Sequence, residues 1–305
     1  MHPAGHVLLG MGDDCALLRA LPPGQVLAVS SDMLVEGRHF FAGTDPAAIG
    51  HKALAVNLSD LAAMGARPLG FTLALALPSV ERAWLQAFSH GMLSLASRAG
   101  CPLIGGDTTR GPLTISITVM GAVPAGQALR RDGAQAGDQI WVSGPLGAAA
   151  LAVEQRRAGR RADGAAALRL DWPMPRFDVG LRLLGLASAA MDISDGLAGD
   201  LNHLLNASGR RGEQPLGAAL YAEALPLDTV LRALPAGRAQ QHVLHGGDDY
   251  ELLFTVPPVH EGRVAALCPT AQKIGQIRPG HGMLIIDTAG RSCPVSARGH
   301  DHFAQ

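Results

Sequence analysis

The chain has 305 residues and a formal net charge of −1, with 25 lysines and arginines against 26 aspartates and glutamates. This length predicts two domains, each large enough to bury its own core. The even charge balance argues against a nucleic-acid-binding protein, and the 48% hydrophobic content argues against long disordered segments. No apolar run reaches the roughly 18–20 residues that span a bilayer, so we expect no membrane-spanning segment.

The cysteines point to a reducing compartment. Cys15, Cys101, Cys268 and Cys293 lie far apart and form no Cys-x-x-Cys pair. This pattern is typical of reduced thiols rather than of a disulfide framework or a zinc site. The N-terminal segment is also too short for a signal peptide. We therefore expect a cytoplasmic protein.

The first half of the chain alternates between predicted strands and helices. Residues 26–34 are expected to form a buried strand running into Asp32. Residues 45–65 are expected to form a helix with Asp45 as its N-cap and Gly65 as its C-terminal stop. The remaining elements predicted here are a strand over 71–78, an amphipathic helix over 79–100, and strands over 102–109 and 113–123.

A segment rich in glycine, alanine and glutamine, residues 124–138, separates this half from the next. The charge run over 156–163 is interpreted as a solvated loop. The pattern predicts an α/β (α+β) protein with two α/β domains, residues 1–136 and 137–305. The elements predicted in the second half are a strand and helix over 139–158, a strand, acidic turn and helix over 189–209 closed by Gly209, a glycine turn and strand over 245–257, a helix over 259–268, and strands over 273–277 and 283–288.

Several common phosphate-binding motifs are missing from the sequence. A P-loop requires GxxxxGK[ST], and neither Lys52 nor Lys273, the two lysines of the chain, fits it. The HRD and DFG segments of protein kinases do not occur. Residues 10–15 begin like a dinucleotide fingerprint, but Cys15 stands where the third glycine belongs. The sequence must therefore use another way to hold phosphate if it binds a nucleotide.

Short acidic turns, most of them flanked by small residues, lie at the ends of predicted strands. They are Gly12-Asp13-Asp14, Ser30-Ser31-Asp32, Asn57-Leu58-Ser59-Asp60, Gly105-Gly106-Asp107-Thr108-Thr109, Asp192-Ile193-Ser194-Asp195-Gly196 and Gly246-Gly247-Asp248-Asp249. Ligands gather at strand ends in open α/β sheets. Carboxylates brought together there repel one another unless a cation neutralises them. Because the donors are all oxygens, Mg²⁺ is favoured over Zn²⁺, and Mg²⁺ commonly bridges carboxylates to phosphates.

Each acidic turn also has a structural interpretation. Asp14 can simply be a turn residue, and Asp60 can be a solvated helix residue. Asp192 and Asp195 can be ordinary caps of the helix that follows them. Asp107 is the hardest to explain by packing, because the glycine pair before it offers no side chain. The case for a ligand site depends on the number of such turns rather than on any single one.

Other polar residues leave two interpretations open. His39 follows the Asp32 turn and is a candidate substrate contact. The pair Arg130-Arg131 is either part of a solvated loop or a phosphate clamp at the domain junction. The histidines at the C-terminal end, including His300, resemble a metal-binding tract, although such a tract is more often exposed to solvent.

Six segments taken in order carry a family resemblance: GMGDDCALL, SSDMLVEGRHF, KALAVNLSDLAAMGARP, LIGGDTTRGPL, DISDGL and GGDDYELLFT. They resemble the thiamine-monophosphate kinase family. Its ATP-binding superfamily includes aminoimidazole ribonucleotide synthetase, selenophosphate synthetase and a hydrogenase maturation protein. The match runs from about Gly10 to Phe303. The resemblance implies an N-terminal α/β domain that forms a homodimer, a C-terminal α/β domain, and ATP with several Mg²⁺ ions in the cleft between them.

Motif matching also implies roles for individual residues. The implied metal ligands are Asp14, Ser30, Ser31, Asp32, Asp60, Asp107, Asp192 and Asp195. The implied ATP contacts are Gly106, Asp107, Arg131 and Ser194. The residues implied to face thiamine monophosphate are His39, Asp248 and His300.

Three departures from the family's pattern affect these roles. The chain begins only nine residues before Gly10, so we expect it to lack most of the N-terminal segment that helps to cover the phosphates. The family's Gly-Gly-Glu-Asp reads Gly-Gly-Asp-Asp here, which shortens the contact made by Asp248 by one methylene. His300 stands where an aromatic ring usually stacks near the thiamine.

The expected reaction is in-line transfer of the γ-phosphoryl group of ATP onto thiamine monophosphate, giving thiamine diphosphate. A phosphate monoester with a second pKa of about 6 is already largely dianionic at neutral pH, so no general base is assigned. Mg²⁺ held by the aspartates would neutralise and align the two anions. The alternatives are a homologue that binds nucleotide or thiamine phosphate without turnover, and another ATP-dependent synthetase of the superfamily.

The sequence disfavours two members of that superfamily. Selenophosphate synthetase is disfavoured because its reactive N-terminal Cys/Lys pair is missing, Cys15 lying inside the acidic turn instead. The hydrogenase maturation role is disfavoured because the chain ends at Gln305 without a terminal cysteine.

Overall fold

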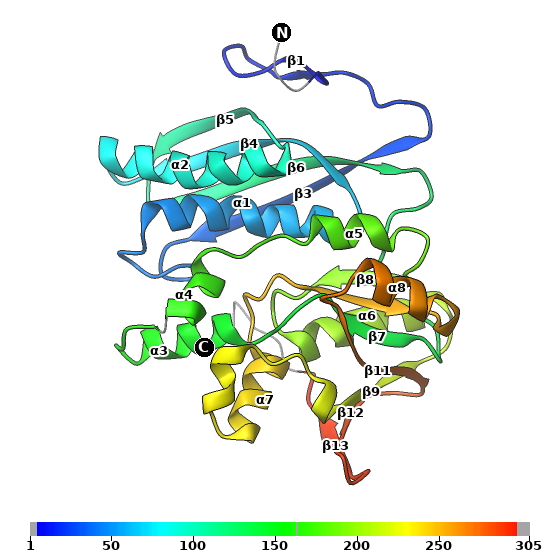
Figure 1. Cartoon of the computed structure of the whole chain (residues 1–305). Coiled ribbons are helices and arrows are strands. Elements are labelled where there is room, and N and C mark those ends of the chain that lie inside the picture. Colours follow the sequence, from blue (N-terminus) through cyan, green and yellow to red (C-terminus); the bar gives the residue numbers. More distant parts are fainter. Residues whose placement is uncertain (1–4, 163, 298–305) are drawn as a thin grey trace. The chain divides into compact units, whose positions relative to one another are not determined.

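The computed structural model describes residues 5–162 and 164–297 and divides into two compact units (Figure 1). The first unit comprises the residues up to Leu61, Ala66–Ala128 and the short segment Asp171–Pro175. The second unit comprises Ala62–Gly65, Leu129–Leu170 and the residues from Arg176 onward. The chain is therefore a two-unit α/β protein, as the sequence predicts.

Residues 129–136 belong to the second unit, although the sequence assigned them to the N-terminal domain. The Leu129 backbone N–H donates to the carbonyl of Met64 at 3.1 Å, and the Ala134 N–H donates to Ser208 Oγ at 3.0 Å. These partners all lie in the second unit. Such long-range bonds leave no local signal in the sequence. The division of roles between residues 1–136 and 137–305 stays a prediction.

The first unit is built on a four-stranded sheet of order β3-β6-β4-β5. Neighbouring strands are antiparallel except for the parallel pair β4 and β5. All four strands were predicted, whereas the small sheet of β1 and β2 was not. The bounds are β1 Val7–Leu9, β2 Leu17–Leu18, β3 Gln25–Val35, β4 Arg67–Leu77, β5 Leu103–Arg110 and β6 Thr114–Pro124.

Two helices, α1 (Pro46–Ala63) and α2 (Arg82–Ala99), complete this unit (Figure 1). The Asp45 carboxylate accepts a hydrogen bond from the Ala47 N–H at 3.0 Å, which confirms the predicted N-cap. The two helices pack closely, because a Cβ on Gly91 would lie 1.9 Å from the Ala47 carbonyl oxygen. Glycine in the contact is therefore required for the helix pair to form.

One face of this sheet is not covered by the helices. Leu27, Val29 and Met33 alternate along β3, and each is more than half exposed. On β6, by contrast, Ile115 and Ile117 point the other way and are fully buried. The prediction of a buried strand over 26–34 is therefore wrong for one of its faces. A run of apolar residues shows that a strand forms but not what packs against it.

The second unit contains, among the described residues, a seven-stranded sheet of order β13-β12-β9-β11-β7-β10-β8. Its neighbouring strands are antiparallel except for the parallel pair β9 and β12. The strands β9 and β13 were not predicted. The bounds are β7 Gln139–Val142, β8 Ala189–Asp192, β9 Leu216–Tyr221, β10 Leu252–Val256, β11 Gln272–Pro279, β12 Met283–Ile286 and β13 Ser292–Val295.

The helices of the described chain also differ in detail from the prediction. The helix α6 continues past Gly209 to Arg211. The helix predicted to end at residue 158 is confirmed as α3, so Arg156 and Arg157 of the charge run are helical and not part of a loop. The helices α4, α5 and α7 were not predicted. The bounds are α3 Ala148–Arg157, α4 Gly164–Asp171, α5 Phe177–Leu183, α6 Leu197–Arg211, α7 Ala236–His245 and α8 Glu261–Leu267, with 3₁₀ turns η1 Ala222–Ala224, η2 Thr229–Ala233 and η3 Pro258–His260.

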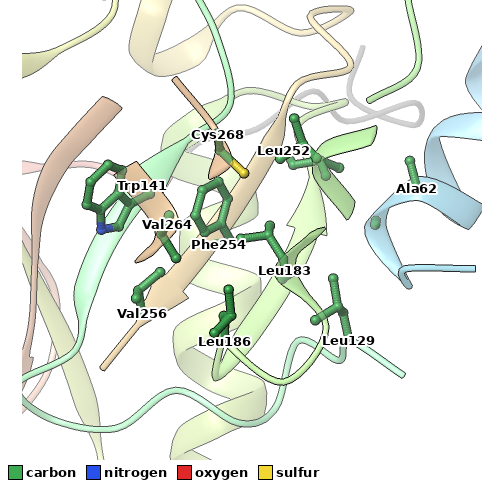
Figure 2. Close-up of a cluster of buried hydrophobic side chains, with 13 residues drawn as sticks. Ala62, Leu129, Trp141, Leu183, Leu186, Leu252, Phe254, Val256, Val264 and Cys268 are labelled. Carbon is green, nitrogen blue, oxygen red and sulfur yellow. The ribbon is translucent and has the colours of Figure 1, made fainter. Parts of the chain in front are cut away.

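A cluster of buried apolar side chains forms the core of the second unit (Figure 2). Trp141 of β7 and Phe254 of β10 stack with their ring centroids 6.4 Å apart, and Leu183 of α5 and Val264 of α8 lie around them. This packing fixes the position of the neighbouring strands β7, β10 and β8, and the acidic turns follow β8 and precede β10. Of the helices described, none combines the length and the apolar character needed to cross a membrane.

Candidate active site

The first acidic centre consists of Ser30, Asp32 and Asp60 in the first unit. Ser30 and Asp32 lie two residues apart on β3 and therefore point to the same face of the sheet. The Ser30 hydroxyl donates a hydrogen bond to Asp60 Oδ2 on α1. One turn earlier on α1, Asn57 Oδ1 accepts from the Asp32 N–H at 3.0 Å. The strand and the helix thus bring the three predicted ligands together.

The two carboxylates of this centre destabilise each other's charge. Burial, and after it the negative charge of Asp60, raises the pKa of Asp32 to about 6. A bound cation would remove this penalty by compensating both charges. The centre therefore has the electrostatic character of a cation site.

Ser31 does not share this centre through its side chain. Its hydroxyl lies 3.0 Å from Thr118 Oγ1 and donates to the Ile117 carbonyl at 3.2 Å. Alternate residues of a strand point to opposite faces, so the hydroxyls of Ser30 and Ser31 cannot both face α1. The structure thus separates two serines that the sequence placed in one ligand set.

Asp14 and Asp107 lie apart from the Asp32–Asp60 pair. Each is exposed, and each belongs to a local turn: Asp107 Oδ1 accepts from the Thr108 N–H at 2.8 Å, and the Asp14 N–H donates to Asp13 at 2.8 Å. Within residues 5–162 and 164–297, no three His, Cys, Asp or Glu side chains form a group that could hold a metal ion. The predicted ligands that the structure brings together in the first unit are therefore Ser30, Asp32 and Asp60.

The glycine turn of β5 has a conformation that only glycine fits. Gly106 has a φ of +147°, and a Cβ at this position would lie 1.9 Å from the carbonyl oxygen of Leu73. The residue is exposed, and its backbone is open to a ligand. This agrees with its expected role as a backbone contact to ATP, a role that stays a prediction.

His39 is held by the backbone that follows β3. Its Nδ1 accepts a hydrogen bond from the Val35 N–H at 2.9 Å, which places the proton of the neutral ring on Nε2. The carbonyl of His39 accepts from Lys52 Nζ at 3.3 Å. Lys52, one of the two lysines, is therefore buried against this loop.

The second acidic centre, in the second unit, consists of the turns 192–196 and 246–250. The Asp248 N–H donates to the Ser194 carbonyl at 2.9 Å, and the Tyr250 N–H donates to the Ile193 carbonyl at 2.9 Å. These bonds join two turns that are about fifty residues apart in the sequence. Ser194, Asp195 and Asp248 therefore lie on adjacent backbone segments, while Asp192 is buried at the end of β8.

Asp200, which the sequence did not single out, holds the first of these turns. Its Oδ2 accepts from the N–H groups of Ser194 and Asp195, each at 3.1 Å. Burial and then the charge of Asp195 raise the pKa of Asp200 to about 7. The N-cap residue of α6 is Gly196, which has no side chain to cap the helix. The capping role considered for Asp192 and Asp195 is therefore not theirs, and Asp200 bonds the N–H groups before the helix instead.

Asp249 attaches the second turn to the segment that precedes α3. Both of its carboxylate oxygens accept from the Gly147 N–H, at 2.9 and 3.0 Å, and burial raises its pKa well above the ordinary value. Its neighbour Asp248 is partly exposed and receives a hydrogen bond from the Tyr250 hydroxyl at 3.3 Å. The two adjacent aspartates thus face opposite environments.

The arginine pair is also divided. Arg130 bonds both carboxylate oxygens of Asp132, and Oδ1 of that carboxylate also lies 3.0 Å from Arg211 Nη1. The side chain of Arg131 is exposed, and its carbonyl accepts from Ser208 at 3.0 Å. Of the pair, Arg131 is therefore the residue available for a phosphate. His300 lies outside the described residues.

The fold and the acidic turns define a class of protein. Residues 12–123 match the family described as AIR synthase related protein, N-terminal domain. A hydrogenase maturation protein HypE has the same fold, with a TM-score of 0.80 at 20% identity over 98% of this chain and 97% of its own. The chain is therefore an AIR synthase-like protein in fold.

The particular family follows from more similar proteins. The chain is 45% identical to the thiamine-monophosphate kinase of Salmonella typhimurium, over 97% of this chain and 92% of that protein. A crystal structure of the enzyme from Stenotrophomonas maltophilia has a TM-score of 0.86 at 44% identity, covering 93% of this chain and 92% of that one. A structure of AaThiL complexed with AMPPCP and TMP has a TM-score of 0.80 at 30% identity, covering 93% and 89%. The chain belongs to the thiamine-monophosphate kinase family.

Proposed function

We propose that this protein transfers the γ-phosphoryl group of ATP to thiamine monophosphate and so forms thiamine diphosphate. The observation that carries the proposal is the end-to-end likeness to a thiamine-monophosphate kinase, 45% identical over 97% of the chain. The related structure complexed with AMPPCP and TMP supports the same pair of substrates. The two acidic centres supply the polar groups that such a reaction requires.

The proposed reaction requires compensation of the negative phosphate charges rather than a general base. The acceptor is a phosphate monoester, which is largely dianionic at neutral pH because its second pKa is about 6. The barrier therefore arises from bringing two anions together and aligning them. Arg131 and the backbone at Gly106 are proposed to bind and orient the phosphates of ATP, together with Asp107 and Ser194.

The first acidic centre fits Mg²⁺. Its hydroxyl and carboxylate oxygens are hard donors, and the mutual effect of Asp32 and Asp60 on ionisation is relieved by a cation. Mg²⁺ keeps several water or phosphate ligands, so a partial set of protein ligands suffices. When bound, Mg²⁺ would neutralise the phosphate charge that builds up during transfer. The ligands proposed at this centre are Ser30, Asp32 and Asp60. The further ligands proposed from the family resemblance, outside this centre, are Asp14, Ser31, Asp107, Asp192 and Asp195.

The acceptor is proposed to contact His39 and Asp248, with His300 as a further contact. The ring of His39 is oriented by the hydrogen bond that its Nδ1 accepts from the Val35 N–H, so Nε2 carries the proton of the neutral ring. Asp248 offers a partly exposed carboxylate on a turn that is bonded to the Ser194 turn. These roles depend on the proposed reaction.

The test is thiamine diphosphate formation by the purified 305-residue chain supplied with ATP, Mg²⁺ and thiamine monophosphate, measured by chromatography. We expect product formation that stops when the divalent cation is chelated. A control without thiamine monophosphate measures any background hydrolysis of ATP. Binding of both ligands by calorimetry without product would contradict the proposal and favour a non-catalytic homologue.

We also propose that the protein is a homodimer, formed through the uncovered face of the first unit's sheet. Leu27, Val29 and Met33 make an apolar row on this face of β3, and such a row is costly to leave in water. The expected result is a dimer in sedimentation velocity that Val29→Asp converts to a monomer. Val259→Asp, at an exposed valine of the second unit, is the matched control. A Val29→Asp variant that stays dimeric would exclude this face.

A cytoplasmic location is proposed as well. The four cysteines are free thiols, and burial raises the pKa of Cys101 to about 12, which keeps that thiol protonated and unreactive. A protein with four unpaired thiols is suited to a reducing compartment. Cell fractionation with a tagged chain tests this, and recovery outside the cytoplasmic fraction would contradict it.

A further inference from the structure

The segment Asp248–Glu251 alternates between outward and inward residues. Asp248 and Tyr250 are partly exposed and have positive φ angles of 68° and 51°, which are uncommon for residues other than glycine. Asp249 and Glu251 between and after them are buried, with exposures of 6% and 1%. Strained backbone persists only where the surrounding structure holds it in place. The buried pair is therefore the natural source of that constraint.

Glu251 is held from several directions. Its carboxylate accepts from Arg176 Nε at 2.7 Å and from Arg169 Nη2 at 2.9 Å, and Arg176 Nη2 makes a second bond to it. The Ser143 hydroxyl also donates to Glu251 and accepts from the Leu252 N–H at 2.8 Å. Charge-assisted and bidentate bonds of this kind fix orientation more strongly than neutral ones.

The same contacts connect this segment to the turn between β7 and α3. Arg169 Nη2 donates to the Pro145 carbonyl at 2.7 Å, and a Cβ on Gly144 would lie 2.7 Å from Glu251 Oε1. The Asp249 carboxylate accepts from Gly147 at the end of that turn. Glu251 and Asp249 therefore attach the strained segment to a neighbouring turn at two points.

We infer that Glu251, with Arg169 and Arg176, is a positioning group that holds Asp248 and Tyr250 in the orientation needed to bind the acceptor substrate. The inference rests on the proposed function, because that proposal places Asp248 at the thiamine monophosphate. A positioning role makes a claim beyond stability. A folded variant with an altered cluster must bind the acceptor less well while it binds ATP as before.

Arg176→Lys is the main test, because lysine keeps the positive charge but cannot make the two-pronged contact. The matched control is Arg182→Lys in α5, where the exposed arginine donates to the Leu267 carbonyl at 2.7 Å and lies 4.0 Å from the Asp178 carboxylate, but does not contact Glu251. Glu251→Gln is the second variant, and its control is Glu261→Gln, at a partly exposed glutamate that pairs with Lys273. Circular dichroism and thermal unfolding establish that each variant is folded before kinetics are measured.

We expect Arg176→Lys to raise the KM for thiamine monophosphate between about 10- and 100-fold, with the KM for ATP within about twofold of wild type. Both controls should match wild type. An unchanged acceptor KM in folded Arg176→Lys, or an equal rise in both KM values, would overturn the inference, whether or not Glu251→Gln folds.

The wild-type chain separates this inference from the proposed function. If it forms no thiamine diphosphate, the proposed function fails, and the Kd for thiamine monophosphate by calorimetry replaces KM in the same comparison. Weaker binding by Arg176→Lys alone would then still support the positioning role. Equal binding by the variant and wild type, or no binding by wild type, would overturn it.

Discussion

The two acidic centres use the same residue type in different ways. In the first unit, Asp32 and Asp60 come from a strand and a helix and meet through their side chains and Ser30. In the second unit, Asp200 and Asp249 are buried and bond backbone N–H groups instead. The first centre is a pair of carboxylates whose negative charges repel each other. The second centre is a pair of turns held in place by hydrogen bonds from backbone N–H groups to the buried carboxylates of Asp200 and Asp249.

This difference shows how ligands and anchors can be told apart. An aspartate whose oxygens are already used by buried backbone donors has little left to offer a ligand, whereas a partly exposed one does. By this criterion Asp249 is an anchor, and its neighbour Asp248 is a candidate ligand. The sequence makes them look equivalent, and the environment separates them.

The largest expected effect is at the first centre. Asp60→Asn keeps the shape of the side chain and removes one charge, so kcat should fall by about 100- to 1,000-fold with little change in stability. Steady-state kinetics at saturating Mg²⁺ measures this. The matched control is Asp178→Asn, at an exposed aspartate of α5. Turnover by Asp60→Asn near the wild-type value would show that the first centre takes no part in the chemistry.

In the second centre, substitutions at the neighbouring residues Asp248 and Asp249 distinguish a ligand-binding role from an anchoring role. Asp249→Ala leaves the buried Gly147 N–H without its acceptor, so the free energy of unfolding should fall by about 1–3 kcal/mol. Asp248→Ala should leave that free energy nearly unchanged and raise the KM for thiamine monophosphate. Urea denaturation and kinetics on both variants provide the comparison. Equal loss of stability in the two variants would remove the distinction between anchor and ligand.

A smaller effect is expected from the serines of β3. Ser30→Ala removes the hydroxyl that donates a hydrogen bond to Asp60. The loss of one such bond costs about 0.5–1.5 kcal/mol, which corresponds to a decrease in kcat/KM of about 2- to 13-fold. Ser31→Ala removes a hydroxyl on the opposite face and should change kcat/KM by less than about twofold if only its backbone binds metal. Similar losses in both variants would mean that the strand alternation does not govern the ligand set.

The smallest effect concerns the stability of the first unit rather than its chemistry. Burial lowers the pKa of His51, which bonds the Pro173 carbonyl at 2.8 Å and lies against Trp172. A lowered pKa in the folded state means that protonation favours the unfolded chain. The stability that His51 contributes is therefore present above about pH 6.5 and is lost as the pH falls through the folded value.

His51→Gln keeps a donor for the Pro173 carbonyl and cannot titrate. The free energy of unfolding should therefore fall less between pH 7.5 and pH 5.5 in this variant than in wild type. His203→Gln, at an exposed histidine of α6, should behave as wild type. Denaturant titrations at the two pH values measure the difference, and identical pH dependence in wild type and His51→Gln would refute the assignment.

The sequence predicted those features that have local signals. The helix α1 follows from the Asp45 cap and from Gly65, which has a φ of +64° in the structure. The end of α6 was misplaced because Gly209 usually stops a helix but is tolerated inside this one. The exposed face of β3 was missed because apolar content indicates a strand and says nothing of its covering layer.

The candidate site divides in the same way. Residue type and glycine spacing indicated Asp32, Asp60 and Asp248, and the two-residue period of β3 was available to separate Ser31 from Ser30. The bonds between the turns 192–196 and 246–250 join distant segments, so no local pattern shows them. The anchoring roles of Asp200 and Glu251 depend on such contacts and could only be found in the folded structure.

The most direct test is a double-mutant cycle, which asks whether the carboxylates proposed as ligands in the two acidic centres act in one phosphoryl transfer. The kcat/KM for thiamine diphosphate formation is measured for Asp60→Asn, Asp195→Asn and the double variant. If both carboxylates act on the same bound nucleotide, the double variant should lose far less than the product of the two single losses. Losses that simply multiply would contradict a shared role and leave the two centres functionally independent.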